Sequence, residues 1–446
     1  GSRDTVQWLE DSTALEFSII PMYPDYHPEH PGGKPQGGRS LDPGLFSFTA
    51  LGEWQTRVAK SRRSAHLKIT DTTLGGGTGF LDPETQKYRE ENDLRGCGAG
   101  LVGPIIKALL DLGVNLNVNA QATDLLIEDG RVAGVRVSVD GVEQTVRARK
   151  GVVLATGGFE WNPDLVRSFL RGPMTSPAGV PTNTGDGLLM AMRAGASLGN
   201  MGKSWWLQSS MELAAHGKGK ANYLIGNSER TRPRGILVNR DAKRFVNEAA
   251  NYNAIGPVLF NWDANKHDYV NLPFWIIVDQ TYVDTYRFFN TTQAGVAPPW
   301  AVSADTIEEL GNKLGMNGAV LHQTVTKFNA DVANGKDTEF GRGDNTYDNF
   351  WGDRNFEGAH RTLGPIENAP FYAVKMESGV LGTCGGPRMN ADAQVIDWND
   401  QPIDGLYVCS NAMSSPTAGV YGGAGGTLGP GMTFGFIAGR HAAMKG

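Results

Sequence analysis

The sequence predicts a mixed α/β protein, and two observations carry that prediction. Two short runs, Gly151–Phe159 and Ile403–Asn411, have the composition of buried strands, and the first is apolar and ends in Thr-Gly-Gly. From about residue 205 to residue 382 the chain instead carries scattered aromatic residues and Asn-rich turns. We therefore expect one discontinuous α/β domain, residues 1–204 and 383–446, with that middle segment inserted as an α+β domain.

Local patterns predict the remaining elements. Gly103–Gly113 has helical apolar spacing, proline in its first turn and glycine at its end, as a helix would. An Asp-Gly turn inside residues 123–139 predicts a hairpin. The other expected elements are a strand over Val114–Val118, a helix over Leu188–Ala196 after a Gly-Asp-Gly turn, one amphipathic helix over 305–334, and a C-terminal helix from Met432.

Composition excludes several classes of protein. The chain has 446 residues, 40% of them hydrophobic, which is enough for a large core. Its net charge of −6 argues against an extended nucleic-acid interface. No run of about 18 apolar residues exists, and GSRDTVQWLE lacks a signal-peptide pattern, so we expect no transmembrane segment and a cytoplasmic location, free or peripheral to a membrane.

The cysteines also favour a cytoplasmic location. Cys97, Cys384 and Cys409 are far apart and have no CxxC spacing, so they predict neither a disulfide framework nor a metal site. A reducing compartment is the expectation that follows.

The segment Thr417–Arg440 is rich in glycine and contains Tyr421. Glycine has no Cβ to hold the backbone away from a ring system, so its N–H groups can reach a flat ligand directly. A helix beginning nearby would add free N–H donors at the same place. The segment predicts a ligand site lined by backbone; a glycine-rich surface loop before a helix is the alternative.

Gly98–Gly103 matches G-x-G-x-x-G, the pattern of a phosphate-binding turn. A nucleotide turn follows a buried strand, whereas residues 86–95 are highly charged. No acidic residue follows at the distance that would hold a ribose. We therefore expect a close-packed helix start, and a nucleotide turn remains the alternative.

Taken together, these segments resemble the flavoproteins of the fumarate reductase and 3-ketosteroid dehydrogenase superfamily, and more specifically the 3-oxosteroid 1-dehydrogenases. The resemblance covers nearly the whole chain in order. The general motifs are Val152–Asn162, Thr184–Ala196 and Gly405–Asn411, and the more specific ones are Tyr23–Lys34, Gly38–Pro43, Phe340–Gly343, Pro370–Lys375 and Leu381–Gly386. It implies FAD as cofactor, a Rossmann-like FAD-binding domain, and a steroid or other apolar ketone as substrate.

One departure from the family stands at the beginning of the chain. Family members start with a strand, a G-x-G-x-x-G turn and a helix that hold the FAD pyrophosphate, and this sequence opens beyond that point. We therefore expect a truncated or incompletely represented chain, or one half of a split enzyme whose partner is a separate polypeptide. Alone, such a chain is expected to hold little FAD, to be inactive and to associate through an open sheet edge.

The resemblance also implies the catalytic residues. Tyr421 and the backbone N–H of Gly425 would donate to the C3 carbonyl oxygen of a 3-ketosteroid. Tyr252 would take the proton from C2, and Tyr26 would hydrogen-bond Tyr252 and relay that proton. Because a free phenol has a pKa of about 10, this role requires a partner or a positive field that lowers the pKa.

The implied cofactor residues lie around the same glycine loop and the two apolar runs. They are Ala122 behind the adenine, Ala155, Thr156, Gly157 and Asp186 at the adenosine end, Asn411 near the ribityl chain, and Gly426, Thr427 and Leu428 near the pyrimidine of the flavin. Ordinary sheet-edge packing is the alternative for each.

Three other functions stay open. A fumarate-type reductase would need an arginine proton donor, and a 4-ene (5α) steroid dehydrogenase resembles this scaffold but has Ser where this chain has Gly423. A protein deficient in FAD that only binds an apolar ligand is the third. Four aromatic residues are expected either to line the substrate pocket or to belong to the core: Trp205, Trp206, Phe288 and Phe289.

Overall fold

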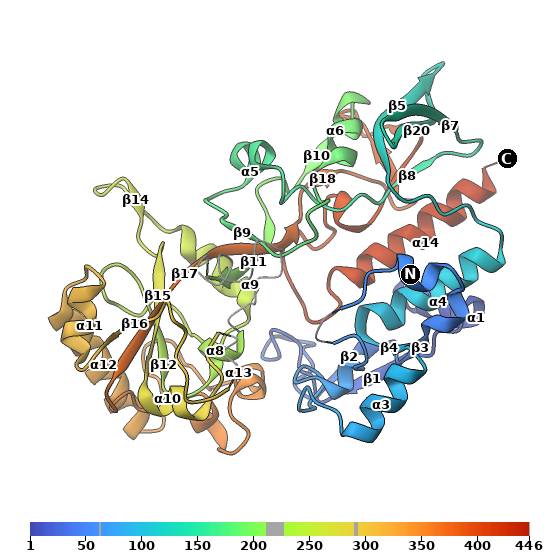
Figure 1. Cartoon of the computed structure of the whole chain (residues 1–446). Coiled ribbons are helices and arrows are strands. Elements are labelled where there is room, and N and C mark those ends of the chain that lie inside the picture. Colours follow the sequence, from blue (N-terminus) through green and yellow to red (C-terminus); the bar gives the residue numbers. More distant parts are fainter. Residues whose placement is uncertain (62–63, 211–226, 290–292, 446) are drawn as a thin grey trace.

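The computed structural model describes residues 1–61, 64–210, 227–289 and 293–445. Two parts are visible in it (Figure 1). One contains both ends of the chain, and the other is formed by its middle. The long strand β17 (Phe371–Thr383) runs from the second part back to the first.

The first part is mixed α/β. Its elements before the crossover are α1 (Ser2–Ser12), β1 (Ser18–Pro21), β2 (Gly37–Asp42), β3 (Phe46–Ser47), α2 (Trp54–Arg57), α3 (Pro83–Glu91), β4 (Leu94–Arg95), α4 (Cys97–Asp111), β5 (Ala120–Glu128), β6 (Arg131–Val139), β7 (Val142–Arg147), β8 (Val152–Leu154), α5 (Pro163–Phe169), β9 (Ser176–Pro177), α6 (Asp186–Arg193) and β10 (Leu198–Gly199). After the crossover come β18 (Gly386–Pro387), β19 (Gln394–Ile396), β20 (Pro402–Val408) and α14 (Leu428–Met444).

The second part is a sheet with helices. It contains β11 (Ser204–Ser209), α8 (Asn227–Thr231), β12 (Gly235–Val238), α9 (Tyr252–Ile255), β13 (Trp262–Asp263), β14 (Asp268–Tyr269), β15 (Phe274–Asp279), α10 (Gln280–Thr285), β16 (Val302–Ala304), α11 (Ile307–Lys313), α12 (Gly318–Ala333), α13 (Thr346–Trp351) and β17. Its sheet has the order β11-β17-β15-β12, with β16 and β9 also pairing with β17. Apolar residues on both of its faces form two buried clusters.

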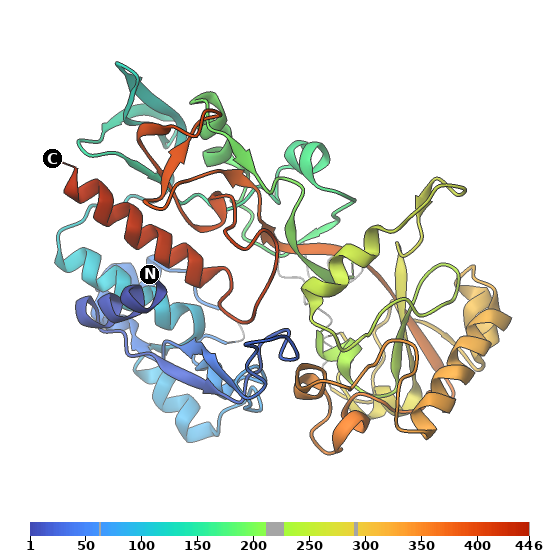
Figure 2. The same cartoon turned by 180° about the vertical axis from the view of Figure 1, so that it is seen from behind.

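Two small sheets position the site in the first part. In one, β20 lies between β19 and β8, and β20 runs parallel to β8 with Val408 opposite Leu154. In the other, β5, β6 and β7 form an antiparallel meander. Figure 2 shows α1, α4 and α14 side by side on the same part.

Several sequence predictions are confirmed. The Asp129-Gly130 turn joins β5 to β6 with both residues in the left-handed region that such a turn requires. The two apolar runs contain β8 and β20, and α6 follows the Gly-Asp-Gly turn. The G-x-G-x-x-G segment opens α4, where a Cβ on Gly100 would lie 2.4 Å from the carbonyl oxygen of Gly44, as a close-packed helix start requires.

Several predicted elements differ in the structure. The helix predicted over Gly103–Gly113 begins at Cys97, so Pro104 lies inside it and not in its first turn. No strand forms over Val114–Val118, whose two valines are 44% and 50% exposed and gain no burial from pairing. The segment 305–334 forms two helices. Gly315 adopts a positive φ of 75°, and Asn317 caps the second helix by accepting a hydrogen bond from the Val320 N–H. The C-terminal helix begins at Leu428, four residues before Met432.

Candidate active site and cofactor cradle

The three predicted catalytic tyrosines meet in the structure. Tyr26 lies in the loop after β1, Tyr252 is the first residue of α9, and Tyr421 lies in the glycine loop before α14. The Tyr26 hydroxyl donates to the Tyr252 hydroxyl over 3.1 Å. The ring of Tyr421 stacks on that of Tyr26 at 5.3 Å and lies 5.7 Å from that of Tyr252. All three rings are at least 94% buried.

Backbone hydrogen bonds hold the three segments together. The Tyr26 N–H donates to the carbonyl of Gly422, which ties the first loop to the glycine loop. Asn253 of α9 donates from Nδ2 to the carbonyl of Gly419 in that same loop. Asn251 caps α9 through Oδ1 and donates from Nδ2 to the carbonyl of Tyr26. Tertiary contacts therefore fix a cluster whose members are far apart in the chain.

Burial controls the ionisation of these phenols. Burial raises the pKa of Tyr26 to about 12, although hydrogen bonds and the Arg230 guanidinium act to lower it. The pKa of Tyr252 lies well above 10, and the pKa of Tyr421 is raised too, in both cases chiefly by burial. The expected lowering field is therefore present but too weak, and all three residues are neutral phenols at pH 7.

Two further tyrosines extend the cluster, and the sequence analysis missed their role. Tyr347 of α13 places its ring 5.0 Å from that of Tyr26, and Tyr23 lies 6.5 Å away. Tyr23 lies three residues before Tyr26 in the same sequence motif, so the sequence could have indicated that Tyr23 lies near the site. Nothing in the sequence placed Tyr347 there.

The four candidate pocket aromatics separate into two environments. Trp205 belongs to the tyrosine cluster, with its ring edge-on to Tyr421 at 6.2 Å. The indole Nε1 of Trp205 is buried without a hydrogen-bond partner. Such an atom is costly unless a ligand pairs with it. The remaining three, Trp206, Phe288 and Phe289, lie in the core of the second part.

Gly425 borders an open cavity, and two residues of its lining, Ile69 and Ala424, also pack against the tyrosine cluster. The φ of Gly425 is +85°, in the region that glycine favours, and a Cβ there would meet no atom within 4 Å. The cavity measures about 610 Å³. Its lining includes Ala424, Gly425, Leu428, Cys97, Gly98 and Arg39. The space beside Gly425 is therefore wide enough for a flat ring system to reach the backbone.

The predicted cofactor residues gather at the carboxyl ends of two parallel strands. Ala155–Gly157 follow β8, and Asn411 follows β20, whose Cys409 N–H donates to the Leu154 carbonyl over 3.0 Å. Gly426 and Thr427 lead into α14 at Leu428, and this helix contacts the turn that contains Asn411. Ligands of α/β sheets bind at such strand ends.

Ala122 lies in β5 and Asp186 begins α6, and these two elements contact each other. Gln121, next to Ala122, donates from Nε2 to Asp186 Oδ2 over 3.1 Å. Thr156 Oγ1 is buried without a partner. This free hydroxyl offers a polar ligand a hydrogen-bonding group at the end of β8, whereas the Cβ position of Gly157 faces the Asn183 side chain. The residues present therefore fit FAD.

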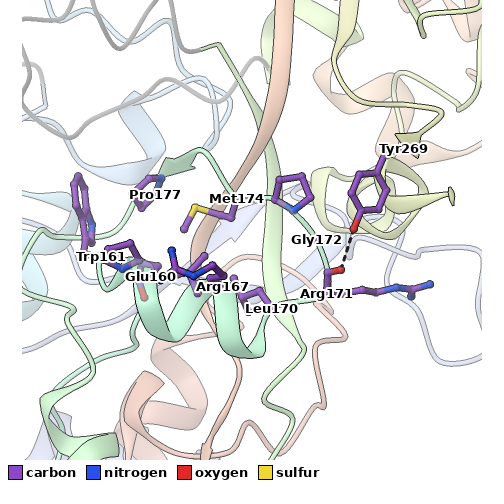
Figure 3. A pocket seen from close by; sticks show the side chains of 12 residues that line it. Glu160, Trp161, Arg167, Leu170, Arg171, Gly172, Met174, Pro177 and Tyr269 are labelled. Atoms are coloured by element: carbon purple, nitrogen blue, oxygen red, sulfur yellow. Dashed lines mark hydrogen bonds between the residues drawn. The ribbon is translucent and has the colours of Figure 1, made fainter. Parts of the chain in front are cut away.

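A separate cavity of about 620 Å³ lies beside α5, and its lining contains none of the predicted site residues (Figure 3). Buried Glu160 and the side chains of Arg167, Leu170 and Met174 line it. Burial raises the pKa of Glu160, whose Oε1 accepts a hydrogen bond from Asn183 over 2.6 Å. No sequence motif indicated this cavity.

Comparison with known proteins agrees with this geometry. Residues 2–428 match the model of the FAD binding domain family. The chain is 35% identical over 445 residues to 4-oxocyclohexanecarboxylate 2-dehydrogenase of Sinomonas cyclohexanicum, covering 98% of this chain and 76% of that protein. It is 34% identical over 468 residues to 3-oxosteroid 1-dehydrogenase of Mycobacterium tuberculosis, covering 97% and 80%.

A solved structure is also similar over the full chain. The 3-ketosteroid delta1-dehydrogenase of Sterolibacterium denitrificans, in complex with 1,4-androstadiene-3,17-dione, superposes with a TM-score of 0.90 at 31% identity. The match covers 100% of this chain and 84% of that one.

In the part of the chain that the structure describes, no helix is both long and apolar enough to cross a membrane.

The chain therefore belongs to the FAD-binding domain family, and it is a flavin-dependent oxidoreductase similar to the 3-oxosteroid 1-dehydrogenases. The predictions of family, mixed α/β fold and FAD as cofactor are confirmed. The division into domains and the roles of individual residues stay predictions.

Proposed function

We propose that this protein introduces the C1–C2 double bond into 3-ketosteroids. One observation carries the proposal: Tyr26, Tyr252 and Tyr421 come together beside the open backbone of Gly425. A desaturase of this kind needs a proton acceptor at C2 and hydrogen-bond donors to the C3 carbonyl. The cluster supplies both kinds of group in a buried setting, and the indole Nε1 of Trp205 adds an unpaired donor for a ligand to satisfy.

In the proposed reaction, the Tyr421 hydroxyl and the Gly425 N–H donate to the C3 carbonyl oxygen and stabilise the enolate that forms when C2 loses its proton. Tyr252 accepts that proton. FAD, when bound, accepts the hydride from C1, so the C1–C2 bond becomes double as the flavin is reduced.

The raised phenol pKa values add a requirement. A neutral Tyr252 cannot accept a proton until it has lost its own. Once it is ionised, the hydrogen bond that Tyr26 donates to it stabilises the resulting phenolate. The active form therefore carries one negative charge shared by the Tyr26–Tyr252 pair. Its population rises as the pH rises.

The test is a turnover assay with the FAD-loaded protein, a 3-keto-4-ene steroid and a dye acceptor. We expect a 1,4-diene product. Reduction of fumarate without any action on the steroid would contradict the proposal.

A second substrate class follows from one specific similarity. The Sinomonas relative is named for a monocyclic 4-oxo acid and is as similar to this chain as the steroid enzymes are. The same proton and hydride chemistry applies to that ring. We place the steroid first, because Ile69, Leu74 and Leu381 add apolar surface around the tyrosines. Comparing kcat/KM for the two substrates decides between them.

Two other functions are less well supported. A 4-ene (5α) dehydrogenase is disfavoured by Gly423, which stands where that resembling family has Ser. A chain deficient in FAD that only binds an apolar ligand would show no visible flavin absorbance after purification with added FAD. That measurement separates the FAD-deficient chain from the two kinds of flavoenzyme, the steroid dehydrogenases and the fumarate-type reductase.

We also propose that a further strand pairs with β8, supplied by a separate polypeptide segment. Within the described residues β8 is the edge strand of its sheet, and Val153 is 39% exposed. A cytoplasmic location is supported by three free cysteines. If adding the matching segment of the Sterolibacterium enzyme does not increase bound FAD, the pairing proposal fails.

A further inference from the structure

We propose that His27 is a positioning residue for the Tyr26–Tyr252 pair, and that it acts only in the neutral form that carries its proton on Nδ1. This inference rests on the proposed function, since it concerns the same two tyrosines. His27 directly follows Tyr26 in the chain. Its Nε2 lies 3.2 Å from Nδ2 of Asn251, the residue that caps the helix beginning with Tyr252.

The orientation of the Asn251 amide is fixed by its partners. Oδ1 accepts from the Ala254 N–H over 2.9 Å, and Nδ2 donates to the Tyr26 carbonyl over 3.2 Å. The second hydrogen on Nδ2 points to His27 Nε2. Since an amide nitrogen can only donate, Nε2 has to accept, and the proton of a neutral His27 belongs on Nδ1.

The other ring nitrogen has the acceptor that this form requires. Nδ1 of His27 lies 3.4 Å from Glu29 Oε1. The titratable groups that face His27 from its own loop are Glu29 and His30, with the His30 ring at 5.2 Å, and the group facing it from α9 is the neutral Asn251. The network therefore links a surface carboxylate through His27 and Asn251 to both tyrosine segments.

The same cluster could be mistaken for a metal site. Ligand atoms of His27, Glu29 and His30 lie within 4.8 Å of one another. A metal on Nδ1 would move the proton to Nε2, where it would face the donor on Asn251. The contact with Asn251 thus favours a proton on Nδ1 over a metal.

Protonation of His27 has the same effect. A second proton, on Nε2, sets two N–H donors against each other at 3.2 Å and removes the contact. Asn251 then loses one of the three partners by which it holds α9 against the Tyr26 loop. Steroid turnover should therefore fall when the pH is low enough to protonate His27.

Three variants test the inference. In His27→Gln an amide oxygen can accept from Asn251 at every pH, in His27→Ala the contact is lost, and His30→Gln is the matched control on the same loop. We expect His27→Ala to lower kcat roughly threefold to tenfold with little change in KM, the scale of one lost hydrogen bond. His27→Gln should keep kcat near the wild-type value at pH 8 and fall less steeply at lower pH, because only the ionisation of the Tyr26–Tyr252 pair then contributes to the acid limb. His30→Gln should keep both the wild-type kcat and the wild-type acid limb.

A nitrogen-15 NMR measurement on histidine-labelled wild-type protein decides the proton position without any turnover. We expect Nε2 of His27 to be unprotonated and Nδ1 to be protonated at pH 8. A proton on Nε2 at that pH overturns the inference, as does an acid limb unchanged in His27→Gln or a wild-type kcat in a folded His27→Ala. If the wild type turns over no ketone, the proposed function fails, and the NMR result still tests His27.

Discussion

Two buried polar clusters in this molecule differ in how their groups are compensated. In the second part, Arg244 pairs with Glu248 at 2.7 Å and with Asp337 at 2.8 Å, and Arg342 pairs with Glu248 at 3.2 Å. These side chains are at most 1% exposed, and opposite charges face each other throughout. This ionic cluster holds together segments that are 93 residues apart in the chain.

The tyrosine cluster has no such compensation. Burial leaves Tyr26, Tyr252 and Tyr421 as neutral phenols with raised pKa values, and the indole Nε1 of the neighbouring Trp205 has no hydrogen-bond partner. Buried charges that are paired hold a fold together, whereas buried polar atoms without partners indicate where a ligand belongs. The predictions below compare the two clusters directly.

The largest expected effect is on catalysis. Tyr252→Phe keeps the ring and removes the proposed proton acceptor, so kcat should fall by roughly 10²–10⁴ while the unfolding midpoint changes little. Steady-state assays with steroid and dye, together with thermal unfolding, measure both. Tyr372→Phe, whose hydroxyl contacts Gln280 away from the cluster, is the control. Wild-type turnover in Tyr252→Phe would mean that this residue only fills space.

The next largest effect is on stability. Arg244→Met leaves Glu248 and Asp337 buried without their main partner, so the free energy of unfolding should fall by about 3–5 kcal/mol. Urea unfolding measures it. The exposed pair of Arg147 with Glu128 gives the control, because Arg147→Met should leave the urea midpoint almost unchanged. Equal losses in both variants would show that burial of the ionic cluster does not matter.

A third variant separates the donor from the proton acceptor. Tyr421→Phe removes one of the two proposed donors to the substrate carbonyl, which should lower kcat by roughly 10²–10³. Tyr407→Phe loses a hydroxyl that contacts His441 in the first part and should keep full activity. If Tyr421→Phe raises KM alone, then Tyr421 binds the ground state and does not stabilise the enolate.

The smallest effect is the pH dependence of stability, which has opposite signs in the two clusters. The pKa of Tyr26 is raised from 10.0 to about 12 by burial, so its contribution is complete below pH 10 and is lost as the pH rises toward 12. Burial alone would raise the pKa of Asp337, but Arg244 lowers it to about 2. That contribution is present above pH 4 and is lost as the pH falls toward 2.

Thermal unfolding across pH measures both limbs. Tyr26→Phe should reduce the alkaline loss alone, and Asp337→Asn should reduce the acid loss alone. An alkaline limb unchanged in Tyr26→Phe would assign it to other buried tyrosines, such as Tyr347 and Tyr282, whose pKa values burial also raises.

Much of the fold could be predicted from the sequence, because it depends on local patterns. The Asp129-Gly130 turn fixes its hairpin through the conformations of two neighbouring residues. The apolar runs at β8 and β20 can be recognised as strands from their composition. The family motifs named Tyr26, Tyr252 and Tyr421 one by one. Local patterns failed where a partner was needed, as at Val114–Val118, which no strand joins in the described residues.

Only the tertiary structure decided how those residues act together. Asn251 joins the Tyr26 loop to α9, and Tyr347 reaches the cluster from α13, through contacts between residues that are distant in sequence. The raised pKa values also come from burial, which no single segment contains. The sequence determined which chemical groups the protein carries; long-range packing determined their distances, their solvation and therefore their protonation.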